Sequence, residues 1–152
     1  MLSPMIMMAL VAAAVLVVAS IRRIPEGQVY TLRRVGGHTR VMHSGTHFML
    51  PLLERVAHKI SLTGANVPVD GLVVSDQRFR GTVYFQVLDP ERADRVIDSV
   101  DGLLQSRTRS LFADASLPQS ADGRRQWLKQ SLNSDMRERG LLVTRVDLSA
   151  IN

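Results

Sequence analysis

The sequence predicts an α+β protein in which an N-terminal transmembrane helix is followed by one domain, an antiparallel sheet packed with helices. Three observations support this prediction. The first 21 residues contain no charged side chain. Residues 28–88 alternate between apolar and polar residues as β-strands do, and residues 89–139 have the period of helices before another strand-like run. Strands, then helices, then a returning strand is an α+β order.

The N-terminal segment, residues 1–22, is predicted to be an anchor helix. It consists almost wholly of Met, Leu, Ile, Val and Ala up to its last residues. Ser3 fits the N-cap, Pro4 fits the first helical position, where its missing N–H costs nothing, and Pro25 should stop the helix. Because a helix of about 20 residues spans about 30 Å, the segment is expected to cross a membrane.

A cleaved secretory signal is the competing interpretation of this segment, with VVAS as the cleavage site. Such signals carry Lys or Arg before the apolar region, and none is present here. We therefore expect a retained signal-anchor with a single pass. Positive charge follows the span and does not precede it, so the bulk of the chain is predicted to be cytoplasmic. The basic residues are Arg22, Arg23, Arg33, Arg34 and Arg40.

Residues 23–152 are long enough for one domain with its own core. The chain has a formal net charge of +5 and no cysteine that could report its redox compartment. Nucleic-acid binders gather basic residues on one face among aromatic ones, whereas here Lys and Arg are scattered and only 5% of residues are aromatic. We expect no nucleic-acid partner. Contact with lipid head groups and a merely solvated basic surface both remain open.

The strands of residues 28–88 are separated by pairs of turn residues. These pairs are Gly36-Gly37, Ser44-Gly45 and Asp70-Gly71. In the run GTVYFQVL, alternate residues are apolar, which predicts a strand with one buried face. The residues on that face are Val83, Phe85 and Val87.

Three helices are predicted after the sheet. Asp89 as N-cap and Pro90 at the first position begin a helix over DPERADRVIDSV. The second helix covers residues 102–115 and the third residues 122–139, with Gly140 just past its end. The third helix carries one apolar stripe, Trp127, Leu128, Leu132 and Met136. The run LLVTRVDL then predicts a strand.

No pattern in the sequence predicts catalysis. His43 and His47 have a spacing that would align them on a helix for a metal, but Ser44-Gly45 between them predicts a turn. Asp70 and Asp76 could act as acid and base, although aspartates at strand ends are more often turn formers. The G-x-S-x-G, S-x-x-K and G-x-G-x-x-G motifs do not occur. We predict no enzyme, cofactor or metal site, and keep a hydrolytic enzyme as an alternative.

Several segments, in this order, match one known family: IPEGQVYTLRRVGGHTRVMHSGTHFMLPLLERVAHKISL, then VVSDQRFRGTVYFQVLDPERA, then RERGLLVTRVDLSAI. The most specific pieces are Pro25-Glu26-Gly27, GTHFMLP with Arg55-Val56 after it, and Asp89-Pro90. These pieces resemble the SPFH domain, also called band 7 or prohibitin homology domain, of stomatins, prohibitins and flotillins. Members of that family also place one membrane segment directly before the domain.

The resemblance implies a non-enzymatic membrane scaffold that oligomerises laterally and organises membrane proteins or lipid patches. It leaves a regulatory subunit or inhibitor of a membrane protease as the alternative. The implied partners are membrane lipids, the chain itself or longer family members, and a membrane protease or other integral protein. Family members usually continue into a long heptad helix, which the sequence does not contain up to Asn152. A short form and small or mixed oligomers are therefore expected.

The same resemblance implies a lipid-contacting surface early in the domain. An apolar loop would dip into the membrane interface while nearby arginines meet head groups. The loop residues are Phe48, Met49, Leu50, Leu52 and Leu53, and the arginines are Arg22, Arg23, Arg33 and Arg34. The open alternative is that the apolar residues fill the core.

Overall fold

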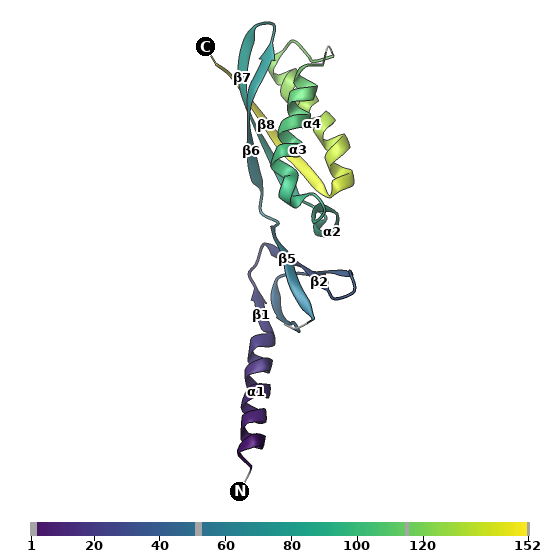
Figure 1. The fold of residues 1–152 in the computed structure, drawn as a ribbon. Helices are drawn as coiled ribbons and strands as arrows, with labels where there is room; N and C mark the ends of the chain where they lie inside the picture. Colours follow the sequence, from purple (N-terminus) through teal and green to yellow (C-terminus); the bar gives the residue numbers. More distant parts are fainter. Residues whose placement is uncertain (1–2, 51–52, 115, 152) are drawn as a thin grey trace. The chain divides into compact units, whose positions relative to one another are not determined.

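The computed structural model describes residues 3–50, 53–114 and 116–151. The chain forms two compact units, Met1–Lys59 and Ile60–Asn152. The predicted boundary between residues 22 and 23 is a different division, into anchor and domain, and stays a prediction. Each unit is built from its own short sheet or sheets (Figure 1).

The first unit begins with helix α1 (Pro4–Ser20). Ser3 is its N-cap and Pro4 its first residue, as predicted. The helix ends at Ser20, whose hydroxyl donates to the Leu16 carbonyl (2.6 Å), because Ile21 takes an extended conformation (φ −86°, ψ 118°). Of the helix residues, only Ser20 is buried.

The prediction of a transmembrane helix is wrong. The helix was expected to continue through Arg22 and Arg23, but these residues lie in strand β1 (Ile21–Ile24), which pairs with another strand. Helix α1 has 17 residues, which at 1.5 Å each give about 25 Å against the roughly 30 Å of a hydrocarbon core. None of the helices in the described part of the chain has the length and apolar character that crossing a bilayer requires.

Two small antiparallel sheets follow in the first unit. Strand β1 pairs with β4 (Gly45–Phe48). Strand β2 (Gln28–Arg34) lies between β3 (Thr39–Met42) and β5 (Glu54–Ser61). The Gly36-Gly37 turn falls between β2 and β3, as predicted. Of the predicted turn pair Ser44-Gly45, only Ser44 lies between strands, because Gly45 is the first residue of β4. A small core fills this unit: Ile24, Leu32, Met42 and Met49.

The second unit is a three-stranded antiparallel sheet covered on one face by helices (Figure 1). Its order is β6 (Ala65–Val74), β7 (Gln77–Val87), β8 (Leu141–Ile151), with β7 in the middle. Val83 of β7 lies opposite Val67 on one side and Val146 on the other. The predicted alternation is confirmed, because Val83, Phe85 and Val87 are buried.

One predicted turn is a β-bulge. Asp70-Gly71 lies inside β6, where the pairing with β7 shifts between Val69 and Leu72, and Gly71 supplies the positive φ (+76°). The hairpin between β6 and β7 turns instead at Ser75-Asp76, both with positive φ (48° and 65°). The prediction was wrong because a glycine beside an aspartate is typical of both features.

The first predicted helix is interrupted. Asp89 caps α2 (Pro90–Ala93) as expected, accepting the backbone N–H groups of Glu91 (3.1 Å) and Arg92 (3.2 Å). The chain then leaves the helical region at Val96 (φ −122°, ψ −3°) and passes through the 3₁₀ turn η1 (Ile97–Ser99). Ala93 and Asp94 are buried next to the break.

The remaining helices lie close to their predicted ranges. Helix α3 covers Val100–Phe112 and α4 covers Ala121–Met136. The last predicted turn of α4 is the 3₁₀ turn η2 (Arg137–Arg139), and Gly140 follows it in the left-handed region (φ 76°), as a glycine past a helix end should. The apolar stripe faces the core, where Leu128, Leu132 and Met136 are buried and Trp127 packs partly.

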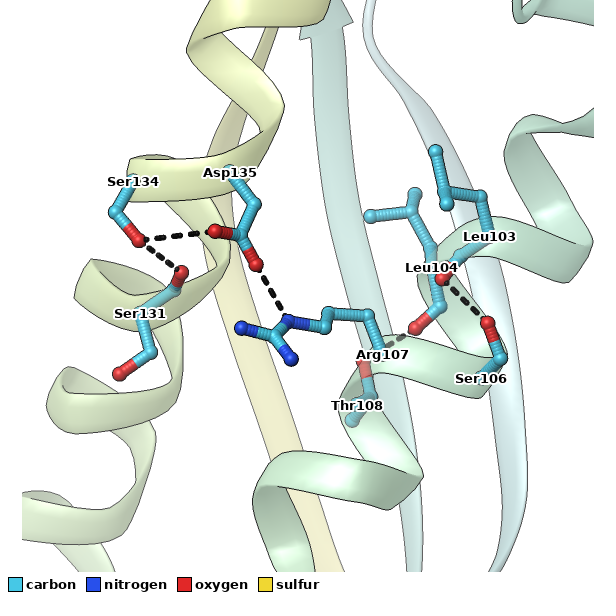
Figure 2. A network of polar contacts seen from close by, with 8 residues as sticks. All are labelled: Leu103, Leu104, Ser106, Arg107, Thr108, Ser131, Ser134 and Asp135. Carbon is cyan, nitrogen blue, oxygen red and sulfur yellow. Dashed lines mark hydrogen bonds and ion pairs between the residues drawn. The ribbon is translucent and has the colours of Figure 1, made fainter.

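A polar contact joins the two long helices of the second unit. The Arg107 guanidinium on α3 donates to the Asp135 carboxylate on α4 (Figure 2). Beside it, the buried Thr108 hydroxyl donates to the Leu104 carbonyl (2.7 Å), so its polar group is satisfied within α3. The Arg107–Asp135 ion pair therefore joins α3 and α4 outside the apolar core that both helices share with the sheet.

Candidate membrane-contacting surface

The whole net charge of the chain lies in its first unit. Residues 1–59 contain seven Lys or Arg and two Glu, which gives +5, whereas residues 60–152 contain twelve basic and twelve acidic residues. The sequence prediction noted the cluster of arginines after the N-terminal span but described the basic residues of the domain as scattered, and it did not compare the net charge of the two units. Comparing the charge of the two halves would have found this asymmetry.

Helix α1 adds an exposed apolar surface to the same unit. Its residues carry no charge, and apolar side chains lie all round it. Met5 is 76% exposed and Val18 is 71% exposed, so apolar side chains are exposed to solvent near both ends of the helix. A helix that is apolar all round is stable only where an apolar environment surrounds it.

Strand pairing brings the end of α1 next to two of the predicted arginines and Phe48. Ile21 lies opposite Phe48, and Arg22 lies opposite His47 in the β1–β4 ladder. The Met49 N–H donates to the Ser20 carbonyl (2.8 Å), and this hydrogen bond joins the residue after β4 to the last residue of α1. Arg22, Arg23 and Phe48 are exposed, while Met49 is buried in the small core.

The other predicted residues form a second group around the start of β5. The buried Glu54 carboxylate accepts the Leu50 N–H (3.4 Å) and lies 4.0 Å from the Arg34 guanidinium. The Val35 N–H donates to the Leu53 carbonyl (3.1 Å), which ties the end of β2 to this loop. Arg33, Leu50 and Leu53 are exposed. Leu52, also predicted, lies outside the described residues.

These placements leave lipid contact as a prediction. Met49 occupies the core position that the alternative interpretation gave to the apolar loop residues. Of the remaining loop residues, Phe48, Leu50 and Leu53 present apolar side chains to solvent. The arginines surround them at two places, one at β1 and one at the end of β2.

A pocket of about 310 Å³ opens in the first unit. It is lined by Arg22, Arg23 and several residues that the sequence prediction did not include, among them Tyr30, Val56 and Lys59. These come from β2 and β5, which are neighbours in the sheet but distant in sequence. No local sequence signal could have grouped them, because the grouping requires knowing which strands pair.

The candidate catalytic and metal-binding residues have structural contacts. The His47 Nε2–H donates to the His43 backbone carbonyl (2.9 Å), since a carbonyl can only accept. Asp70 accepts from the Arg80 guanidinium (2.7 Å), and Asp76 lies in the hairpin turn. Among the described residues no cluster of three His, Cys, Asp or Glu could hold a metal ion. The absence of a metal or catalytic site stays a prediction.

Two groups with shifted pKa values lie in the second unit, outside this surface. The backbone N–H and the hydroxyl of Ser116 donate to Asp114 and hold the pKa of its carboxyl below the ordinary value. A hydrogen bond to Asp147 and the charge of that carboxylate raise the pKa of Arg145. Neither shift points to catalysis, because both belong to exposed local pairs.

Comparison with known proteins identifies the class. A family model described as "SPFH domain / Band 7 family" matches residues 22–152, and the chain belongs to this family. The resemblance noted in the sequence is therefore confirmed.

The relatives found are longer than this chain. An uncharacterized protein of Mycobacterium tuberculosis is 28% identical over 156 aligned positions, covering 94% of this chain and 41% of that protein. The mitochondrial stomatin-like protein 2 of Homo sapiens is 26% identical over 103 residues, covering 62% of this chain and 29% of that protein. An uncharacterized protein of Schizosaccharomyces pombe is 24% identical over 86 residues, covering 53% and 24% respectively. The chain thus spans less than half the length of these relatives.

Proposed function

We propose that the chain is a membrane-associated, non-enzymatic scaffold whose first unit contacts lipid and whose copies associate side by side. One observation carries the proposal: the exposed, uncharged helix α1 belongs to the unit that also holds the entire net positive charge. Membership of the SPFH family supports the scaffold role, since its stomatin-like members are membrane-associated and generally non-enzymatic.

Lipid satisfies both features of the first unit at once. Burying apolar surface is worth about 25 cal/mol per Å², so an exposed apolar helix gains from any apolar surroundings. Basic residues near an anionic leaflet gain about 1 kcal/mol each. A purely apolar protein partner would satisfy α1 and leave the charge of Arg22 and Arg23 without an attraction. A surface with hydrocarbon beneath anionic head groups satisfies both.

The partners of the scaffold follow from the same arrangement. Copies held at one surface are already concentrated and oriented, so modest contacts suffice for lateral association. The expected partners are lipids, other copies or longer family members, and integral membrane proteins, a membrane protease among them. No described contact favours a dedicated protease regulator over a scaffold.

Vesicle flotation tests the lipid part of the proposal. The full chain, diluted from detergent, should float with phosphatidylcholine vesicles and more completely when phosphatidylserine is included. Arg22→Gln/Arg23→Gln should weaken the anionic component by roughly tenfold or more, because two charges near the surface are lost.

The matched control removes two exposed charges from the second unit, Lys129→Gln/Arg137→Gln. This variant should float like the unaltered chain. Equal losses in both variants, or a wild-type chain that stays in the soluble layer with both vesicle types, would overturn lipid contact through the first unit.

A further inference from the structure

We propose that the pocket in the first unit binds a single-chain anionic lipid, with the acyl chain on an apolar floor and the head group among cations. The inference rests on the proposed function and deepens it by naming the class of lipid. The pocket has a volume of about 310 Å³ and lies wholly within residues 22–59.

The floor of the pocket is the small core of the unit. Ile24, Leu32, Met42 and Met49 line it, and none is more than 6% exposed. They come from β1, β2, β3 and the residue after β4, so the floor is held by backbone pairing. Two of the four are methionines, whose flexible side chains adapt to an irregular apolar guest. The floor can therefore adapt its shape to a hydrocarbon chain and is not complementary to one particular ligand.

The rim of the pocket is cationic. Arg22 and Arg23 line it from β1 and Lys59 from β5. The Lys59 ammonium lies 5.4 Å from the centre of the Tyr30 ring, which also lines the pocket. The attraction between an ammonium and an aromatic face keeps this charge at the pocket.

No carboxylate is among the residues that line the pocket in the described part of the chain. The unit has only two, and the Glu54 carboxylate is engaged with the Leu50 N–H and Arg34. The other, Glu26, is exposed in the turn before β2. Three cations with no lining anion favour a negatively charged guest and disfavour a neutral sterol or a cationic amphiphile.

The volume of the pocket bears on whether the ligand has one acyl chain or two. About 310 Å³ is at the lower limit of small-molecule pockets, which cover roughly 300–1,000 Å³. A space of this size favours one acyl chain over two. The ligand is therefore a fatty acid or a lysophospholipid with an anionic head, taken up from the adjoining membrane.

Photo-cross-linking tests the pocket with the full chain in phosphatidylcholine vesicles. A diazirine-bearing palmitate should label the floor residues around Met42 and Met49, as mapped by peptide mass spectrometry. Excess laurate should compete with this label, whereas dodecanol and dodecyltrimethylammonium should not. A diazirine phosphatidylglycerol with two chains should label the floor far less.

Two variants separate charge from volume. Lys59→Gln removes a rim charge and should lower the competed label about tenfold. Val56→Trp should fill the pocket mouth and abolish the label with the rim charges kept, because Val56 lines the pocket and is 36% exposed. The controls are Arg55→Gln on the same strand and Val35→Trp, an exposed position outside the lining, and both should leave the label unchanged.

The outcomes distinguish this proposal from the proposed function. Label confined to α1, label insensitive to laurate, label stronger with the two-chain probe, or equal losses in variants and controls would each overturn the pocket while flotation persists. Failure of the unaltered chain to float would overturn lipid contact itself. Floor label that laurate removes and that Lys59→Gln and Val56→Trp both reduce is the result expected.

Discussion

Gly140 shows how one residue joins two distant segments. It has a positive φ (+76°), and its carbonyl accepts the N–H groups of Leu88 (2.9 Å) and Asp89 (3.1 Å). A Cβ at this position would lie 2.4 Å from the Asp89 carbonyl oxygen. Only glycine therefore allows the start of β8 to approach the start of α2.

Replacing Gly140 by alanine should lower the free energy of unfolding by at least about 2 kcal/mol, because the left-handed backbone and the backbone clash both penalise a side chain. Urea denaturation followed by circular dichroism measures the change. Gly102→Ala is the control, since nothing lies within 4 Å of its Cβ and the position is inside α3. That variant should gain up to about 1 kcal/mol, and a similar loss in both would contradict this account.

The sequence predicted single-residue signals well. Asp89 and Ser3 lie at helix N-caps, Gly140 at a helix end, and Gly36 at a turn between strands. Each of these features depends on the conformational preference of one residue and its immediate neighbours, so it can be predicted from the local sequence alone. The lining of the pocket could not be predicted in this way, because Lys59 and Arg22 come from strands of two different sheets and line one pocket only in the folded unit.

At the scale of elements, errors occurred where a distant partner decided the local structure. Apolar composition favoured a helix through Arg22, but pairing of Ile21 with Phe48 converts these residues to a strand. Asp70-Gly71 has turn chemistry, yet β7 continues opposite it and makes the pair a bulge. Propensity is weak compared with a ladder of hydrogen bonds, so these elements required knowledge of the tertiary pairing.

The β6–β7 hairpin offers a test at this scale. Its two turn residues, Ser75 and Asp76, both have positive φ, between Val74 and Gln77, which pair with each other. This geometry favours Asn-Gly. The Ser75→Asn/Asp76→Gly variant should raise the free energy of unfolding by about 0.5–1 kcal/mol, measured by urea denaturation.

The matched control is Ser75→Ala. Alanine is sterically disfavoured at positive φ, so this variant should have a lower free energy of unfolding than the unaltered chain. A destabilised Asn-Gly variant would mean that the side chains of Ser75 and Asp76 make contributions beyond their backbone conformations.

At the scale of the whole molecule, lateral association should depend on the apolar loop of the first unit. Leu50→Asp should reduce oligomer size without unfolding the chain, because the side chain is 37% exposed and the contact with Glu54 uses the backbone N–H. Cross-linking of the detergent-extracted protein, read by mass photometry, measures the size distribution.

Leu50→Asn and Val73→Asp serve as controls, the first isolating charge at the same site and the second placing a charge on an exposed residue of the second unit. Val73→Asp should leave the distribution unchanged. An unaltered size distribution in Leu50→Asp, or an equal reduction in Val73→Asp, would place the lateral contacts elsewhere.

The balance of twelve basic against twelve acidic residues in the second unit has a consequence for crowding. Bodies with a large net charge repel one another, and neighbouring copies would then keep apart at low ionic strength. A unit of zero formal charge experiences no such long-range repulsion from its copies. The second units of neighbouring copies would therefore approach to the limit set by their size and short-range contacts, and any change of packing density with salt concentration would come from the first units, which carry +5 each.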